Sequence, residues 1–216
     1  MTIKALVICE RSQILTEQLR RFGIEAYSLD IDASYCKDES MHQYHIESCY
    51  KEFLEYRLHE IDPDVIYAFT PCIYLSNAGL KHYSLKHNPL EKVNARKEKR
   101  EEDLAWFLHL LENQYATHMC LENPVGYVNS HVKPSQVVHP HFFGARHNKR
   151  TCLWMKNLPT LKRTHYIKDE DIIRGWVDKQ GGSSQAERSR RRSKLDSHFA
   201  YQIARQHSQY LKAIYR

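Results

Sequence analysis

Two short segments, 50 residues apart, each end an apolar run in a reactive side chain beside proline. The first ends in Pro71 and Cys72, and the second ends in Glu122, Asn123 and Pro124. Because proline disfavours continued sheet pairing, this pattern predicts a thiol and a carboxylate at the tips of two strands. If both strands belong to one parallel sheet, both groups project from the same edge. Such an edge suits covalent attack by the thiol on a heterocycle, assisted by an acid.

The elements around these segments alternate between strands and helices. Apolar runs predict buried strands at residues 3–9, 26–31, 65–69 and 118–121. A first helix is expected between Ser12, as its cap, and Gly23, as its end. Further helices are expected over residues 50–58 and 90–114. This alternation predicts an α/β fold with a mostly parallel sheet and helices on both faces.

Other segments give weaker patterns. Residues 33–47 are polar without clear periodicity, so no element is predicted there. Residues 137–138 and 151–155 are further candidate strands, with an antiparallel direction left open. Residues 96–103 alternate in charge and are expected to form a solvated helix face.

Composition limits the class of protein. The 216 residues carry a net charge of +6 and are 42% hydrophobic, which fits one globular domain and mildly favours an anionic partner such as nucleic acid. No apolar run has the roughly 18 residues of a membrane span, and no signal peptide is visible. The six cysteines stand singly, without a C-x-x-C pair, so we expect a reducing cytoplasm.

Histidines are numerous, and His139, His141 and His147 lie near Cys152. Their spacing matches no zinc pattern, so we predict no metal. Solvated or locally hydrogen-bonded histidines are the expected alternative.

Three regions are predicted along the chain. Residues 1–179 form the catalytic α/β domain, residues 180–194 form a flexible basic segment, and residues 195–216 form a helix that packs back on the domain. Five of the seven residues from Arg188 to Lys194 are basic. This run is either a phosphate contact, through Arg188, Arg190, Arg191 and Arg192, or a solvated linker.

Polar residues also follow the first two predicted strands. Glu10 and Ser12 come after the first strand, and Asp30 ends the second. Ligands of open α/β sheets bind outside the carboxyl ends of the strands, where an acidic residue accepts hydrogen bonds from ribose hydroxyls. The loop from Cys9 to Gln13 lacks glycine, so a nucleoside cofactor without phosphates fits better than a dinucleotide.

These motifs together resemble the cytosine-C5 DNA methyltransferases, most closely their short phage-encoded relatives. Thr70-Pro71-Cys72 is similar to the family's Pro-Pro-Cys motif, and Glu122-Asn123-Pro124 is similar to its Glu-Asn-Val motif. Further similar segments are the first cofactor loop at 9–12, the acidic ribose ligand at Asp30, the basic strand motif at 149–154 and the C-terminal segment at 193–204. Only 25 residues separate Pro124 from Arg150, which leaves no room for a target-recognition domain.

The resemblance implies a Rossmann-like methyltransferase fold and methyl transfer from S-adenosylmethionine to C5 of cytosine in DNA. It makes Cys72 the nucleophile that adds to C6, Glu122 the partner of N3, Asn123 a shaper of that loop and Arg150 an anion or base contact. The expected cofactor contacts are Cys9, Glu10, Ser12, Asp30 and Pro71. The expected nucleic-acid contacts are Asn77, Lys149 and the four arginines of the basic segment. The cytoplasm would be that of a bacterial host if the chain is phage-encoded.

Two other functions stay open. A relative without catalysis would bind nucleic acid or a nucleotide. A C5-pyrimidine-modifying enzyme would keep the thiol chemistry but act on a mononucleotide or use another one-carbon donor. Purely structural roles for Cys72 and Glu122, as a buried small residue and an ion-pair partner, are the alternatives to both.

Overall fold

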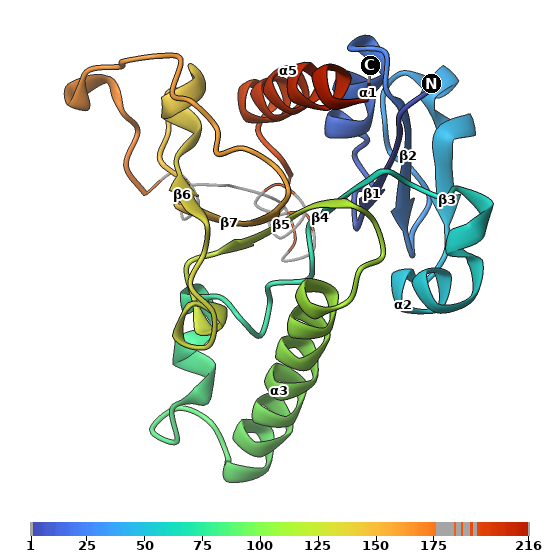
Figure 1. The fold of residues 1–216 in the computed structure, drawn as a ribbon. Coiled ribbons are helices and arrows are strands. Elements are labelled where there is room, and N and C mark those ends of the chain that lie inside the picture. The colour runs from blue at the N-terminus through green and yellow to red at the C-terminus, as the bar shows by residue number, and fades with distance from the viewer. Residues whose placement is uncertain (1, 176–183, 185–186, 188–190, 192–193, 216) are drawn as a thin grey trace.

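A seven-stranded sheet forms the centre of the computed structural model, which describes residues 2–175, 184, 187, 191 and 194–215 (Figure 1). Its strands are β1 (Lys4–Ile8), β2 (Glu25–Asp30), β3 (His45–Glu47), β4 (Val65–Ala68), β5 (His118–Pro124), β6 (Gln136–Val138) and β7 (Thr151–Lys156). They lie in the order β3-β2-β1-β4-β5-β7-β6, and β7 runs antiparallel to both of its neighbours. This order and the reversed β7 are those of the Rossmann-like methyltransferase fold, so the predicted fold class is confirmed.

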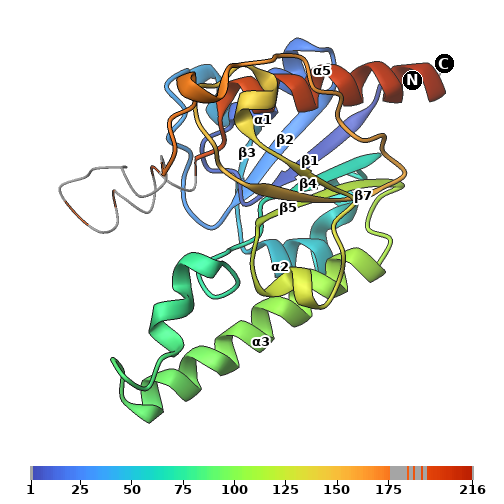
Figure 2. The same cartoon turned by 90° about the vertical axis from the view of Figure 1, so that its left-hand side faces the viewer.

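Helices cover both faces of the sheet, as Figure 2 shows. The helices α1 (Ile14–Arg21) and α5 (Ser197–Ile214) lie on one face, while α2 (Tyr50–Glu52) and α3 (Leu90–Glu112) lie on the other. Successive side chains of a strand point to opposite faces, so Val7 packs with the α1 and α5 side and Ile8 with the α3 side. Central strands such as β1 and β4 therefore contain continuous apolar runs, as expected for a sheet buried on both faces.

Short helical turns connect these elements. They are the 3₁₀ turns η1 (Glu39–Tyr44), η3 (Leu58–Glu60), η4 (Asn77–Tyr83), η5 (Tyr127–Ser130), η6 (Pro140–Phe143) and η7 (Asp169–Asp171), and the π turn η2 (Phe53–Arg57). The helix expected over residues 50–58 is thus a series of α, π and 3₁₀ turns.

The start of α1 differs from the expectation. Gln13, not Ser12, occupies the cap position directly before the helix, and Gln13 has a left-handed backbone conformation without a side-chain capping bond. The carboxylate of Glu10 accepts the backbone N–H groups of Leu15 (2.5 Å) and Thr16 (3.1 Å) instead. Ser12 as the helix cap was therefore wrong, because an acidic side chain four residues before the helix reaches its free N–H groups.

The edge strand β3 was not predicted from the sequence. It has only three residues, and polar contacts hold it: the Ser28 hydroxyl lies 2.8 Å from His45 Nδ1, and His45 Nε2 lies 2.9 Å from the Asp32 carbonyl. Such a strand carries no apolar periodicity by which to recognise it.

The C-terminal helix α5 packs on the sheet beside α1. Phe199, Ile203 and Leu211 belong to the hydrophobic core on that face. Asp196 caps the helix by accepting the N–H groups of His198 (3.0 Å) and Phe199 (3.1 Å). The division into regions ending at residues 179 and 194 stays a prediction, since most of the segment between lies outside the described residues.

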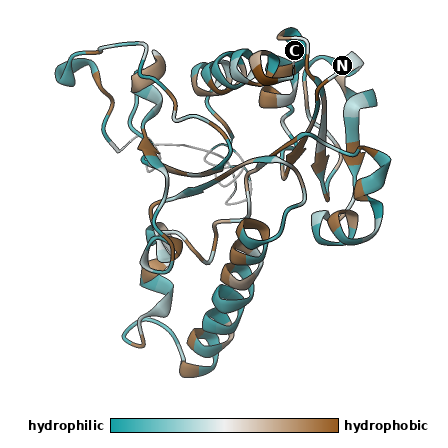
Figure 3. Cartoon of the chain, in the orientation of Figure 1, coloured by the Kyte–Doolittle hydropathy of each residue, from teal (hydrophilic) through white to brown (hydrophobic). Residues whose placement is uncertain are grey.

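The outer half of α3, together with η4, projects away from the sheet (Figures 1 and 3). The half of α3 next to the sheet buries Leu104, Phe107 and Leu110 in the core. The middle of α3 is hydrophilic, as Figure 3 shows. Among the residues that the structure describes, no helix is long and apolar enough to pass through a membrane.

Candidate active site

The two predicted motifs meet at the carboxyl ends of β4 and β5. These strands are parallel neighbours, with Ala68 opposite Leu121, so Thr70 and Asn123 follow at the same level. Asn123 is fully buried, and its side-chain Nδ2 donates to the carbonyl oxygen (3.2 Å) and the hydroxyl oxygen (3.1 Å) of Thr70. The side chain of Asn123 thus joins the segment that carries Cys72 to the segment that carries Glu122.

A second set of backbone contacts joins the turns that follow. The Tyr127 N–H donates to the Leu75 carbonyl (2.7 Å), and the Asn77 N–H donates to the Val125 carbonyl (3.4 Å). Gly126 forms a bridge with Ser76, and a Cβ atom at Gly126 would collide with the Leu75 carbonyl. The close approach of the two turns therefore requires glycine at position 126.

Cys72 begins an ordered turn. Its carbonyl oxygen accepts the N–H groups of Leu75 (3.1 Å) and Ser76 (2.9 Å), and the residue is half-buried. Pro71 and Asn77, which flank it, are exposed. The turn therefore holds a partly accessible thiol at the sheet edge, as the Pro-Cys pattern predicts.

Burial raises the pKa of the Glu122 carboxyl, and the nearby Lys149 ammonium acts in the opposite direction. Lys149 comes two residues before β7, whose amino end lies at this edge because β7 is antiparallel to β5. A carboxyl with a raised pKa is protonated more readily than usual, and in its protonated form it can donate a hydrogen bond.

Lys149, rather than Arg150, is the cation that acts on Glu122. Arg150 is exposed, and its charge acts on His139 and Cys152 instead. The sequence placed both cations near the site but gave no signal for which of the two faces the carboxylate.

The first loop forms its turn without glycine. Cys9 and Gln13 both have left-handed backbone angles, with φ of 58° and 53°. This conformation costs a non-glycine residue on the order of 1 kcal/mol, so other contacts must hold it. The Cys9 N–H donates to the Leu29 carbonyl (2.7 Å), which fixes the end of β1 beside β2.

Gln13 binds the first loop to the segment after β2. It is fully buried, its Nε2 donates to the Met41 carbonyl (2.8 Å), and its Oε1 accepts the Ser34 hydroxyl (2.7 Å). Arg11 Nε also donates to the Ala33 carbonyl (2.6 Å). Nothing in the sequence indicated this connection, because Gln13 stood out there only as part of a loop that lacks glycine.

The two acidic residues of this edge, Glu10 and Asp30, differ in whether their carboxylates are available to bind a ligand. The buried Glu10 carboxylate is engaged by the start of α1 and by the Thr16 hydroxyl (2.6 Å), and burial raises the pKa of Glu10 to about 7 against these hydrogen bonds. Asp30 is half-buried at the end of β2 and accepts the Asp32 N–H at Oδ1 (3.1 Å). Asp30 therefore suits a ligand hydroxyl, whereas Glu10 stabilises the helix start. Ser12 is buried nearby.

Of the basic segment, the structure describes Arg191, which is exposed and pairs with Glu187 (2.5 Å). Arg188, Arg190 and Arg192 lie outside the described residues. Their expected contact with phosphates stays a prediction.

The histidines of the 139–147 region make local contacts. The rings of His139 and His141 lie 5.0 Å apart, and His147 Nε2 lies 3.0 Å from Asp196 Oδ2. Within the described part of the chain, no three His, Cys, Asp or Glu side chains are grouped to hold a metal ion.

No protein-family model matches the chain, and no curated protein matches it. Similar solved structures include the methyltransferase EhMeth of Entamoeba histolytica, at 11% identity and a TM-score of 0.46, which covers 77% of this chain and 58% of that one. A mutant DNMT2 of Spodoptera frugiperda is 12% identical with a TM-score of 0.42, covering 80% of this chain and 55% of that one. The chain thus spans a little over half of either structure, and the functional argument rests on the site itself.

Proposed function

We propose that this protein transfers a methyl group from S-adenosylmethionine to C5 of cytosine in DNA, through a covalent adduct on Cys72. The observation that carries the proposal is the bond between Asn123 and Thr70, which joins the Cys72 and Glu122 segments at the carboxyl edge of the sheet. Ligands of open α/β sheets bind at that edge.

The residues at the end of β2 fit the nucleoside part of S-adenosylmethionine. Asp30 offers a half-buried carboxylate for ribose hydroxyls, and the first loop has the left-handed turns at Cys9 and Gln13 without glycine. When bound, this cofactor supplies an electrophilic methyl group on a sulfonium. Pro71 is exposed beside the thiol and would border the methyl group.

Cys72 and Glu122 have complementary roles on the pyrimidine. Cytosine C5 is a weak nucleophile, and addition of the Cys72 thiolate to C6 forms an S–C6 bond and gives C5 the character of an enamine carbon. The protonated Glu122 carboxyl donates to N3, where negative charge develops on addition. After methylation, loss of the C5 proton restores the C5–C6 double bond, and the S–C6 electron pair returns to the sulfur of Cys72.

The arm formed by residues 73–100 supports a nucleic-acid substrate. This stretch holds seven lysines and arginines but only two glutamates, and it begins directly after Cys72. Lys81, Lys86 and Lys92 are exposed on it, where they would attract phosphates. A base stacked in a duplex is out of reach of a thiol, so the substrate cytosine is either flipped out or single-stranded.

One observation favours a second candidate, a binding protein without catalysis. The side chain of Gln13 is buried between the first loop and the segment after β2, next to the proposed cofactor site. If this connection excludes S-adenosylmethionine, the chain keeps its nucleic-acid surface but has no methyl donor.

Methyl transfer from labelled S-adenosylmethionine tests the proposal. Single-stranded DNA, duplex DNA and free deoxycytidine nucleotides would be incubated with the wild type and with Cys72→Ser, and the nucleosides separated by mass spectrometry. Labelled 5-methylcytosine in DNA, with the wild type alone, supports the proposal. Label in the free nucleotide alone would favour a mononucleotide enzyme, and tight DNA binding without any label would favour the binding protein.

A further inference from the structure

Two arginines of α3 lie between three tyrosines from other segments. The Arg96 guanidinium lies over the rings of Tyr74 (4.8 Å) and Tyr83 (5.1 Å). The Arg100 guanidinium lies over the rings of Tyr83 (4.9 Å) and Tyr127 (3.8 Å). These five residues, in the order Tyr74, Arg96, Tyr83, Arg100 and Tyr127, form what we call the Tyr–Arg ladder.

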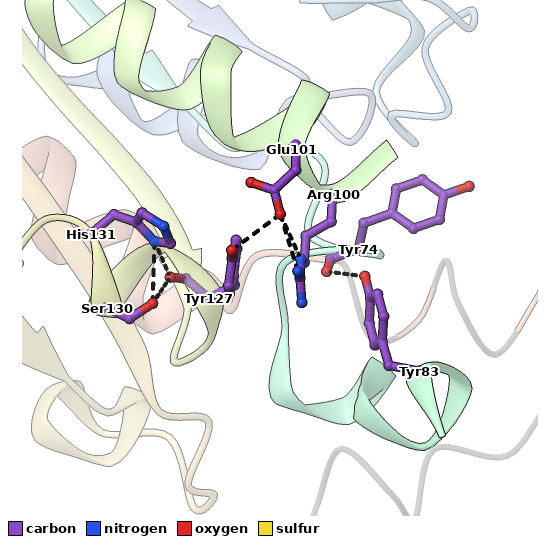
Figure 4. A network of polar contacts seen from close by, with 7 residues as sticks. All are labelled: Tyr74, Tyr83, Arg100, Glu101, Tyr127, Ser130 and His131. Atoms are coloured by element: carbon purple, nitrogen blue, oxygen red, sulfur yellow. Dashed lines mark hydrogen bonds and ion pairs between the residues drawn. The ribbon is translucent and has the colours of Figure 1, made fainter. Parts of the chain in front are cut away.

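One end of the ladder holds the turn of Cys72. Tyr74 is two residues after Cys72, and Arg96 Nη2 donates to the carbonyl oxygen of Ile73 (2.7 Å), the residue next to the thiol. The Tyr83 hydroxyl donates to the Tyr74 carbonyl (2.9 Å), as Figure 4 shows. Both the side chains and the backbone of this turn are therefore attached to α3 and η4.

The other end of the ladder holds the turn after Glu122. Tyr127 lies under Arg100, and its hydroxyl donates to Glu101 Oε1 (3.1 Å), which also pairs with Arg100 (3.0 Å; Figure 4). The Tyr127 N–H donates to the Leu75 carbonyl (2.7 Å), so this turn also touches the Cys72 turn directly. The ladder and this backbone bond close a ring of contacts that includes both turns and one helix.

The burial of Arg96 and Arg100 shows that they do not belong to the solvated face expected for residues 96–103. Both are half-buried, with 19% of the Arg100 side chain exposed, while Lys97, Lys99 and Glu98 of the same helix are exposed. A guanidinium over an aromatic ring is attracted by the negative face of the ring, and its planar shape allows it to stack on two rings at once. Four such contacts link segments that are otherwise far apart in sequence.

We propose that Arg96 and Arg100 are positioning residues, which hold the turns of Cys72 and Glu122 in a fixed relation during the reaction. This inference rests on the proposed function for its catalytic meaning. It adds that α3, which lies outside the pair of motifs, determines how the thiol and the carboxyl face one base. Reacting groups displaced by about 1 Å lose on the order of a hundredfold in rate.

The first test compares three variants on α3. Arg100→Ala removes two contacts of the ladder, Arg100→Lys keeps the charge but loses the planar face, and Glu98→Ala is the matched control on the exposed side of the same helix. At saturating DNA, we expect single-turnover formation of the Cys72 adduct to slow by about tenfold or more in both Arg100 variants. Glu98→Ala should react at the wild-type rate.

A second measurement does not depend on methyl transfer. Hydrogen exchange reports on the amides of Leu75 and Tyr127, whose bonds fasten the two turns. We expect Arg100→Ala to speed their exchange by about tenfold while the amides of β1 and β4 keep wild-type protection. If Arg100→Ala does not fold, Tyr83→Leu, which removes the central ring, takes its place.

The outcomes separate the two proposals. A wild type that forms no adduct on any substrate defeats the proposed function, and hydrogen exchange alone then decides whether the ladder holds the turns. Unchanged exchange at Leu75 and Tyr127 in Arg100→Ala would overturn the positioning role, as would an unchanged adduct rate. Equal loss of protection across the whole sheet would also overturn it, because Arg100 would then be a general stabilising residue.

Discussion

The side-chain amide of Asn123 donates to both the carbonyl and the hydroxyl oxygen of Thr70, across the buried ends of β4 and β5. Asn123 directly follows Glu122, and Thr70 lies two residues before Cys72, so one amide sets the relation between the segments that carry the proposed carboxyl and thiol. Its carbonyl oxygen, Asn123 Oδ1, is buried without a hydrogen-bond partner among the described residues.

Replacing Asn123 should destabilise the protein. Asn123→Leu leaves the Thr70 carbonyl and hydroxyl buried without their donor, which costs about 1–3 kcal/mol. Urea unfolding of the wild type and the variant measures this difference. Thr70→Ser, which keeps both acceptors, is the control and should lose less than about 1 kcal/mol. A loss below about 0.5 kcal/mol in Asn123→Leu would show that the bond does not fasten the two strand ends.

Asp30 should determine cofactor affinity. In Asp30→Asn the charged acceptor for ribose hydroxyls is lost, and hydrogen bonds to charged groups contribute about 1.5–3 kcal/mol. We expect calorimetry to show S-adenosylmethionine binding weakened by about tenfold or more. Asp32→Asn is the matched control, because Asp32 pairs with Arg11 at the surface (2.9 Å). Equal affinity of Asp30→Asn and the wild type would remove Asp30 from the site.

Glu122 should give the reaction an alkaline limb. Burial raises the pKa of this carboxyl, and only its protonated form donates to N3, so the adduct rate should fall as pH rises through that raised pKa. Glu122→Gln keeps an N–H donor that does not titrate. The variant should react more slowly but lose the alkaline limb in a pH–rate profile. An identical alkaline limb in wild type and variant would assign it to another group.

His207 should make stability depend on pH. It is buried against the Tyr67 ring, its Nε2 lies 3.1 Å from the Pro159 carbonyl, and burial lowers its pKa to about 4. The unfolded chain takes up a proton at a pKa near 6.5, about two and a half units higher, so stability present above that pH is lost as pH falls toward 4.

The measurement is urea unfolding at pH 7 and pH 5. Between these values the wild type should lose about 2 kcal/mol more than His207→Gln, which keeps a donor but does not titrate. An equal loss in both proteins would mean that His207 is protonated in the folded state.

Strands such as β1 and β4 could be predicted because each contains a continuous apolar run. The meeting of the Cys72 and Glu122 motifs at one edge followed from the same reasoning, since parallel neighbours end at one edge, but the bond between Asn123 and Thr70 was not predicted. The three-residue strand β3 was not predicted, because polar contacts of Ser28 and His45 hold it and it has no apolar pattern.

Other features depended on partners distant in sequence. Arg96 and Arg100 belong to a run of alternating charge, and only the positions of Tyr74, Tyr83 and Tyr127 in the structure show that their faces are covered. Gln13 likewise gains its role from Met41, 28 residues later. Residue type and local spacing carry no information on such contacts, so the sequence predicted the reactive groups but not what holds them in place.

Trapping of the covalent adduct tests the central claim most directly. The protein would be incubated with S-adenosylmethionine and DNA that contains 5-fluorocytosine, in single-stranded and duplex form, and the intact mass measured. Fluorine at C5 does not leave as a proton does, so the complex should persist as a protein–DNA adduct. Peptide mapping should locate this adduct on Cys72. Cys72→Ser, the matched control, should give none. A folded wild type that forms no adduct with either DNA, or an adduct that persists in Cys72→Ser, would contradict the account.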